Sequence, residues 1–418
     1  MQRHNRLFIV FLLAFILRIS LIFVAHHGDL NNNISWGTLA VERGLGGFYE
    51  GEDWPFSAPN QPPLTILMLV GVRAIWQAVE TTSWWLNNNV NFFYSPFIWF
   101  WEEKGMTLLV KLPGILADLG IGWLIYEYFR KKNRIKLGFK LTAVWLFNPV
   151  VWYNSAVWGQ TDSVVNLLGL IAVFALLDKK LIKVGIFMTL SLLFKGSLAV
   201  FTPILLVAAY LQKHRLKVWL KAASYSLIAT VLVSMWFHPQ IDVFFWLFNL
   251  YKQRILSGEI GFLTANAFNF WWLIDSGETL DSNIFLGIPA RIWGFAIAGI
   301  GTAGIIYWLR KKFSDKTLFF SLALVALLTF LFMTRIHERY LYPFFPPATI
   351  LLGLIPGLAL PYTILSALHL LNLYHLFWAP SFTSLEALYR TSWLAYAIAM
   401  LNILIFFYLL RLLKKARI

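Results

Sequence analysis

The stretch Thr-Arg-Ile-His-Glu-Arg-Tyr at 334–340 places four ionisable side chains between two strongly apolar runs. Arg335 and Arg339 are four residues apart, so on a helix they would share one face and could clamp a phosphate through bidentate contacts. His337 would add a hydrogen bond, and Glu338 would hold one arginine in position. The alternative is a purely structural cluster of salt bridges.

A carboxylate lies near the other end of the chain. Asp29, in His-His-Gly-Asp-Leu, directly follows the first apolar run. A carboxylate at the rim of an apolar pocket can act as a general base and take the proton of a sugar hydroxyl as that hydroxyl attacks. We expect partial burial to raise its pKa toward a useful range. The alternative is an aspartate that closes a turn or caps a helix.

A second polar group follows the helix-breaking pair Asn148-Pro149. Trp158, Gln160 and Asp162 lie at the end of the apolar run that this pair interrupts. An aromatic ring, an amide and a carboxylate in sequence can contact the hydroxyls of a sugar. Asp162 is equally suited to capping the helix that follows it.

Four charged residues lie inside apolar runs, where charge is costly and ordinarily faces the protein interior. Lys195 divides the long run 184–212, and a cation at such a break suits an anion near the membrane surface. Alternatively, Lys195 snorkels to the interface. Lys111 and Asp118 are seven residues apart and share a helix face, with Arg18 as a candidate partner. A structural ion-pair network and a substrate role remain open for them.

Composition indicates that membrane helices position these residues. The chain has 418 residues, of which 59% are hydrophobic and only 13% charged, whereas soluble domains are about a quarter charged. We therefore predict an all-α polytopic membrane protein. Ten apolar runs are long enough to cross, and 184–212 would add two short helices, giving about twelve crossings. The ten runs are 7–25, 105–129, 137–157, 161–177, 218–236, 285–309, 317–334, 340–357, 359–376 and 391–410.

The distribution of basic residues predicts the orientation. With the N-terminus inside, the cytoplasmic segments hold 23 of the 35 Lys and Arg residues, as the positive-inside rule requires. These segments are 1–6, 130–140, 178–183, 213–221, 310–316 and 411–418. Both termini are then cytoplasmic, no cleavable signal peptide is expected, and the candidate site faces outward. The net charge of +15 is thereby explained by topology, so nucleic acid is not an expected partner.

The whole chain, 1–418, is expected to form a single transmembrane domain with two long exoplasmic segments. Segment 26–104 mixes polar turns with aromatic stretches, which favours helices lying along the membrane surface. Residues 63–77 are apolar enough to dip into the membrane, but the orientation of the later loops requires that they do not cross it. Segment 237–284 has a similar composition, and 411–418 forms a basic cytoplasmic tail. The sequence contains no cysteine and no metal-ligand spacing, so no metal and no cofactor are expected.

A carboxylate base, a cationic phosphate clamp and sugar-contacting groups beside lipid fit glycosyl transfer from a lipid-phosphate sugar. The chain resembles the GT-C superfamily of integral-membrane glycosyltransferases. It is most similar to polyprenyl-phosphate-sugar mannosyl- or glucosyltransferases and to the glucosyltransferases of asparagine-linked glycosylation. The resemblance rests on Asp29, "NQPPLTI" at 60–66, "KLPGILADL" at 111–119, "NPVVW" to "VWGQTD" at 148–162, Lys195 and "TRIHERYLYP" at 334–343.

The resemblance implies that Asp29 is the catalytic base and that His337, Glu338 and Arg339 lie near the donor phosphate. It implies an inverting, metal-independent hexosyltransferase that carries mannose or glucose to a lipid-linked glycan or glycolipid. Leu30 follows Asp29 where protein O-mannosyltransferases have Glu, which argues against a protein acceptor. The enzyme would lie in the plasma membrane of a prokaryote, or in the endoplasmic reticulum of a eukaryote. The alternative function is a lipid-linked sugar flippase or transporter.

Overall fold

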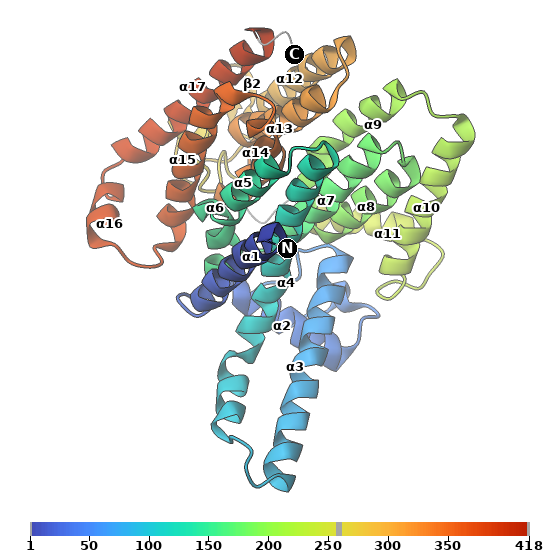
Figure 1. Cartoon of the computed structure of the whole chain (residues 1–418), viewed down its shortest axis with the longest axis vertical. Coiled ribbons are helices and arrows are strands. Elements are labelled where there is room, and N and C mark those ends of the chain that lie inside the picture. The colour runs from blue at the N-terminus through green and yellow to red at the C-terminus, as the bar shows by residue number, and fades with distance from the viewer. Residues whose placement is uncertain (1, 256–260, 416–418) are drawn as a thin grey trace.

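The computed structural model describes residues 2–255 and 261–415, and helices make up most of it (Figure 1). Two short strands, β1 (Ile284–Phe285) and β2 (Ile288–Pro289), pair antiparallel. The helices, in chain order, are α1 (Gln2–Leu21), α2 (Gly28–Arg43), η1 (Phe48–Glu50), α3 (Pro63–Asn89), α4 (Pro96–Lys131), α5 (Ile135–Leu146), α6 (Pro149–Trp152), η2 (Tyr153–Trp158), α7 (Asp162–Leu177), α8 (Leu181–Phe194), η3 (Gly196–Phe201), α9 (Thr202–Leu211), α10 (Leu216–Ser234), α11 (Val243–Leu250), η4 (Tyr251–Ile255), η5 (Trp271–Leu273), α12 (Ala290–Lys311), α13 (Asp315–Phe332), η6 (Glu338–Phe344), α14 (Phe345–Leu352), η7 (Pro356–Leu358), α15 (Ala359–Phe377), α16 (Thr383–Tyr389) and α17 (Trp393–Lys415).

Long apolar helices support a membrane-embedded protein. In the part of the chain that the structure describes, seven helices are long and apolar enough to cross a membrane. They are α3, α4, α10, α12, α13, η7 with α15, and α17. The predicted runs 161–177 and 184–212 correspond to shorter apolar helices, α7, α8 and η3 with α9. The total of twelve crossings therefore stays a prediction.

The two expected helix breaks are present. Proline lacks a backbone N–H, and the chain bends away from α5 at Asn148, whose side chain accepts a hydrogen bond from the Val150 N–H and so begins α6. Lys195 has an extended backbone (φ −162°, ψ 138°) between α8 and η3. Both breaks place polar backbone and side chains within otherwise apolar segments.

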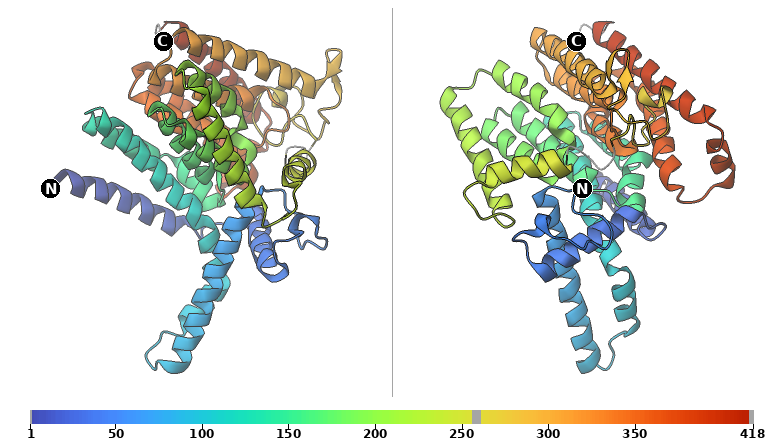
Figure 2. Two further views of the ribbon diagram at one scale, coloured as in Figure 1. Left: turned by 90° about the vertical axis from the view of Figure 1, so that its right-hand side faces the viewer. Right: turned by 180° about the vertical axis from the view of Figure 1, so that it is seen from behind.

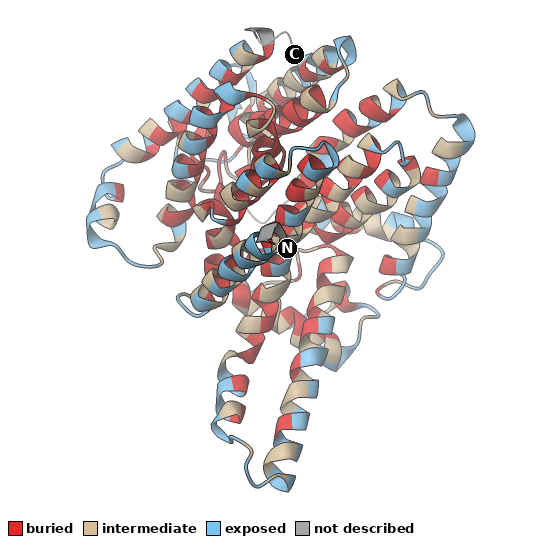
Figure 3. Cartoon of the chain, in the orientation of Figure 1, coloured by how far each residue is buried: buried red, intermediate tan, exposed pale blue. Residues whose placement is uncertain are grey.

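Helix α13 lies at the centre of the largest core. Almost every residue from Thr317 to Leu331 is buried, and α12, α14, η6 and α17 pack around the helix. Figure 3 shows this burial concentrated in the middle of the molecule, with exposed residues along the outer helices. The segment that leaves the end of α13, 333–340, is held by hydrogen bonds to the loop around 262–265.

The first long segment is more helical than expected. Helices α3 and α4 form an antiparallel hairpin that projects from the rest of the molecule (Figures 1 and 2). In Figure 2 this hairpin runs across the direction of α1 and α12. At 27 residues, α3 is long and apolar enough to cross a membrane, so the expectation that 63–77 does not cross remains a prediction. Its tip carries exposed Trp85, Phe92 and Tyr94.

Two of the basic segments predicted to be cytoplasmic meet in the fold. Lys132, after α4, pairs with Asp315 at the start of α13 at 2.7 Å, and Arg134 donates to the carbonyl of Gly353. Helix α17 continues into the predicted basic tail as far as Lys415, and residues 416–418 of that tail lie outside the described residues. Which side of the membrane these segments occupy stays a prediction.

Candidate functional site

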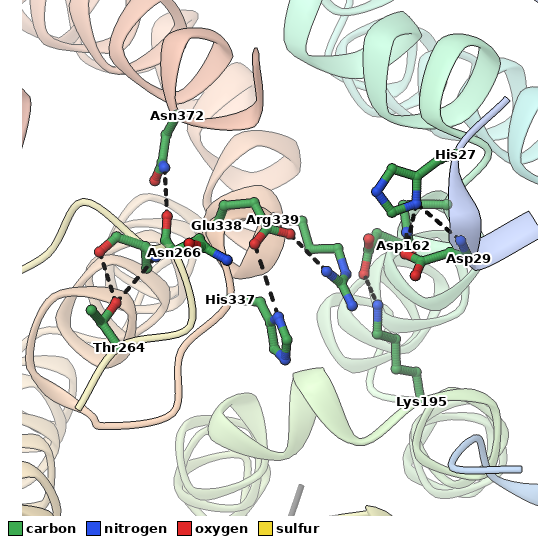
Figure 4. A network of polar contacts seen from close by, with 12 residues as sticks. His27, Asp29, Asp162, Lys195, Thr264, Asn266, His337, Glu338, Arg339 and Asn372 are labelled. Carbon is green, nitrogen blue, oxygen red and sulfur yellow. Dashed lines mark hydrogen bonds and ion pairs between the residues drawn. The ribbon is translucent and has the colours of Figure 1, made fainter. Parts of the chain in front are cut away.

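Four segments that are distant in sequence bring their charged side chains together (Figure 4). Asp29 lies in the first turn of α2, and Asp162 is the first residue of α7. Lys195 lies at the break after α8, and Arg339 lies at the beginning of η6. Each residue lies at a helix end, where the chain can turn without leaving helical backbone groups unpaired in the core.

Asp29 is a partly exposed carboxylate with two close polar neighbours. The Gln160 side-chain amide donates to its Oδ2, and Nδ1 of His27 lies 3.5 Å from the same oxygen. His27 also caps α2, because its Nδ1 accepts from the backbone N–H of Asp29. Its ring lies 4.8 Å from that of Trp158. The Asp29 side chain is thus oriented by groups that are themselves packed.

The pKa of Asp29 is lowered, not raised, which corrects the sequence-based expectation. Burial does raise it, but the charge of Arg339 and of His27, the hydrogen bond from Gln160 and the charge of Lys195 together outweigh burial. Nearby cations favour a carboxylate's charged form. Asp29 is therefore ionised at neutral pH and can accept a proton.

Arg339 provides a buried positive charge beside Asp29. Its Nη1 donates to Oε1 of Glu338 at 2.7 Å, and Glu338 is fully buried. Burial disfavours the guanidinium charge, but the carboxylates of Glu338 and Asp29 outweigh it and raise the pKa of Arg339. Figure 4 shows the side chain extending from Glu338 toward Asp162. Glu338 thus holds one arginine in position, as the sequence predicted.

His337 is uncharged at neutral pH. Burial, together with the charges of Arg339 and Lys195, lowers its pKa to about 3. Its backbone is bridged to Ala265 and Asn266 of the preceding long loop. The ring can therefore donate or accept a hydrogen bond in the site but adds no positive charge to it.

Arg335 and Arg339 do not share a helical face, so that prediction is wrong. Helix α13 ends at Phe332, and Arg335 has a left-handed backbone (φ 59°) in the loop before η6. Its Nε and Nη2 form a bidentate pair with Asp281 at 2.7 and 3.0 Å. The chain leaves the helix because the N–H of Arg335 and the carbonyl of Ile336 pair with loop 262–265 instead.

Asp162 and Lys195 form a nearly buried ion pair. Nζ of Lys195 lies 2.6 Å from Oδ1 of Asp162, with side-chain exposures of 9% and 3%. The second carboxylate oxygen of Asp162 is buried and has no hydrogen-bond partner in the described residues. Lys195 also lies over the ring of Tyr340, 5.5 Å from its centroid. The lysine therefore faces the site, and Asp162 binds it instead of serving only as a helix cap.

Trp158 and Gln160 are buried and contact His27 and Asp29, respectively. Trp158 is fully buried, with its ring against His27 and against Phe377 at 5.7 Å, so no sugar can contact it in this structure. Gln160 is also nearly buried and points at Asp29. The structure therefore does not favour the predicted contact of Trp158 and Gln160 with sugar hydroxyls, because Gln160 binds Asp29 and Trp158 packs on His27.

Arg18 and Asp118 form a buried ion pair, whereas Lys111, on the same helix as Asp118, binds backbone carbonyls instead of that carboxylate. Nε of Arg18 donates to Asp118 at 2.9 Å with both side chains fully buried. Asp118 also accepts from Ser155, Ser163 and Tyr342. Nζ of Lys111 donates to three backbone carbonyls, those of Ile22, Ala25 and Val157. Among the described residues Nη2 of Arg18 is buried without a partner, but the ammonium of Lys111 and the carboxylate of Asp118 have their partners within the protein, so the structural alternative is favoured.

A cavity of about 440 Å³ lies next to the charged cluster. One part of its wall is polar and includes Lys195, Arg335, His337 and Tyr340. Another part is apolar and comes from η3, α12 and α13, with Val200, Phe295, Phe330 and Met333. Its volume is in the range of ordinary ligand sites. We call it the cationic cavity, and its two kinds of wall suit a molecule with an anionic end and an apolar tail.

Sequence reasoning missed three residues of this site. His27 caps α2 and faces Asp29, a role that its place in the sequence did not indicate. Asp281 lies in a segment that the sequence marked only by its aromatic residues, and its role appears only through Arg335. Tyr340 was part of the quoted motif, but only the structure places its ring below Lys195.

Comparison with protein-family models gave no match, and comparison with curated proteins gave none either. Among the described residues, no group of three or more His, Cys, Asp or Glu side chains is arranged to hold a metal ion. The functional interpretation therefore rests on the geometry of the site.

Proposed function

We propose that the protein is a membrane glycosyltransferase that moves a hexose, mannose or glucose, from a polyprenyl-phosphate donor to a lipid-linked glycan or glycolipid. The supporting observation is the position of Asp29, a carboxylate whose pKa is lowered by the charges of Arg339 and Lys195, together with the place of Lys195 in the wall of the cationic cavity. A base and a cluster of cations side by side are what the two ends of such a reaction require.

In the proposed reaction an acceptor hydroxyl attacks the anomeric carbon of the donor sugar. A new C–O bond forms as the bond from that carbon to the phosphate oxygen breaks. The polyprenyl phosphate leaves with the electron pair, and Asp29 takes the proton of the hydroxyl. Attack opposite to the leaving group inverts the anomeric centre.

The cations stabilise the charge that grows on the leaving phosphate. Arg339 and Lys195 are held in place by Glu338 and Asp162 before substrate arrives, so little reorganisation is needed in the transition state. His337 supplies a neutral hydrogen bond. Arg335 also lines the cavity, but its charge is largely balanced there by Asp281. We expect these side chains to replace a divalent metal.

The apolar wall of the cavity supports a lipid donor. Phe295 of α12, with Phe330 and Met333 from the end of α13, would contact the prenyl units nearest to the phosphate.

The test is transfer by purified protein. Radiolabelled polyprenyl-phosphate mannose and polyprenyl-phosphate glucose are each incubated with the protein and a membrane lipid extract, with and without EDTA. We expect label from one donor to appear in a new lipid or glycan in both conditions. Label that stays in both donors would contradict the proposal, and activity lost in EDTA would contradict only the metal-free mechanism.

A further inference from the structure

Two carboxamide side chains lie in the wall of the cationic cavity. Asn60 and Gln61 line the same space as Lys195, Arg335 and His337. They come from the segment that precedes α3, far in sequence from the cationic groups. The cavity therefore has neutral hydrogen-bonding groups in addition to the charged ones that suit a phosphate.

The backbone around these two residues is fixed by contacts that do not involve their side chains. The Tyr49 hydroxyl donates to the carbonyl of Gln61 at 2.7 Å, and the indole of Trp36 donates to the carbonyl of Ser57 at 2.8 Å. Pro62 and Pro63 then begin α3 and restrict the chain further. Both amides are thus presented from a rigid segment.

The start of α3 is also tied to the cation site. The Thr65 hydroxyl donates to the carbonyl of Phe194, the residue directly before Lys195. This hydrogen bond is buried and joins the two segments that contribute to the cavity wall. The amides therefore keep a fixed position relative to the lysine.

The side chains themselves have little to bind within the protein. Within the residues that the structure describes, their one hydrogen bond runs from Nε2 of Gln61 to Oδ1 of Asn60, at 3.3 Å. The other polar atom of each amide, Nδ2 of Asn60 and Oε1 of Gln61, forms no hydrogen bond within these residues and is available to a ligand. A carboxamide both donates and accepts, which matches a sugar hydroxyl better than it matches a phosphate, an acceptor only.

We propose that Asn60 and Gln61 bind hydroxyl groups of the donor hexose and thereby help to select the sugar. The inference rests on the proposed function and assigns to these two residues the sugar end of the donor. Hydrogen-bonding side chains discriminate well between hexoses, because the epimer with a misplaced hydroxyl leaves polar groups of the site unpaired.

The test compares a lipid phosphate with and without its sugar. Binding of polyprenyl-phosphate hexose and of bare polyprenyl phosphate is measured for wild type, Asn60→Ala and Gln61→Ala. We expect each variant to bind the sugar-bearing donor about three- to tenfold more weakly, as loss of a neutral hydrogen bond implies. Binding of the bare lipid phosphate should stay within twofold of wild type, which also shows that the variants are folded.

A matched control is Asn88→Ala, at an exposed amide near the tip of the α3–α4 hairpin, and it should change neither affinity. If Asn60→Ala and Gln61→Ala weakened the binding of both ligands equally, the inference would be overturned, because the residues would then act on the phosphate or on folding. Unchanged affinity for both ligands would overturn it as well. Failure of the wild type to bind either lipid would instead contradict the proposed function.

Discussion

In the proposed reaction, Asp29 has to act as a base both in the free protein and in its complex with the donor. In the free protein Arg339 and His27 keep its pKa below the ordinary value, so it is ready to accept a proton. A bound phosphate would offset the charge of Arg339 and Lys195. Because those cations are what lower the pKa, their neutralisation must raise it and make Asp29 a stronger base in the donor complex.

This coupling predicts that kcat/KM and kcat decline at different pH values on the acid side of their pH profiles. Activity requires ionised Asp29, so it is lost as pH falls through the pKa of that carboxyl. The value of kcat/KM reports the free protein and should not lose activity between pH 7 and pH 5 through Asp29, whereas kcat reports the complex and should decline at a higher pH. Transfer rates measured across pH at low and saturating donor test this. Coincident acid limbs would argue against the coupling.

Arg339 is expected to depend on its planar shape as well as its charge. Arg339→Lys keeps a cation beside Glu338 but loses the guanidinium fork, so donor affinity should fall about tenfold and kcat should also decrease. Arg339→Ala is a poorer test, because it leaves Glu338 buried without its partner. The exposed Arg43→Lys serves as a control that should alter neither value. Normal donor binding by Arg339→Lys would remove this arginine from the phosphate site.

At the scale of elements, much of the fold follows from simple sequence signals. Pro149 and the Lys195-Gly196 pair predict the helix breaks, because proline and glycine are unfavourable in the middle of a helix and a charge is unfavourable in an apolar one. The geometry of 334–340 could not be predicted in this way. Its loop forms because the backbone of Arg335 and Ile336 pairs with residues 262–265, a tertiary contact with no local signature.

The buried pair between α1 and α4 is expected to stabilise the protein without acting on substrate. Arg18→Met leaves the Asp118 carboxylate without its cation in a fully buried place, which should cost about 3–5 kcal/mol of unfolding free energy. Adding Asp118→Asn to this variant should restore a large part of the lost unfolding free energy, because the amide carries no unpaired charge. Thermal unfolding in detergent measures both effects. If Asp118→Asn alone weakened donor binding with unchanged stability, the structural assignment would be wrong.

At the scale of the whole molecule, the site draws on the first, middle and last parts of the chain. The sequence could group these parts only by predicting that their loops share one side of the membrane. Which side chains meet depends on how the helices pack around α13, and neither charge counts nor apolar runs contain that information. Hence Asp29 and Arg339 were both predicted, and the resemblance implied one shared site, but the contacts of Asp29 with Gln160 and His27 were not predicted.

The shared side can be tested directly, because the chain contains no cysteine. Single cysteines at Asp53 and Ser381 should react with an impermeant maleimide in intact cells. Cysteines at Asn133 and Lys179, in the basic segments, should react only after the membrane is opened. All four positions are exposed in the fold, so burial would not explain a lack of reaction. Labelling of Asn133→Cys in intact cells would reverse the predicted orientation.

The most direct test of the central claim is the turnover of Asp29→Asn at saturating polyprenyl-phosphate hexose. The amide keeps the shape of the side chain but cannot take the acceptor's proton, so the rate should fall about 10²- to 10⁴-fold while donor affinity stays close to wild type. Asp53→Asn, at an exposed aspartate of the same segment, is the control and should be fully active. A near-normal rate for Asp29→Asn would contradict the account of Asp29 as the base of a glycosyl transfer.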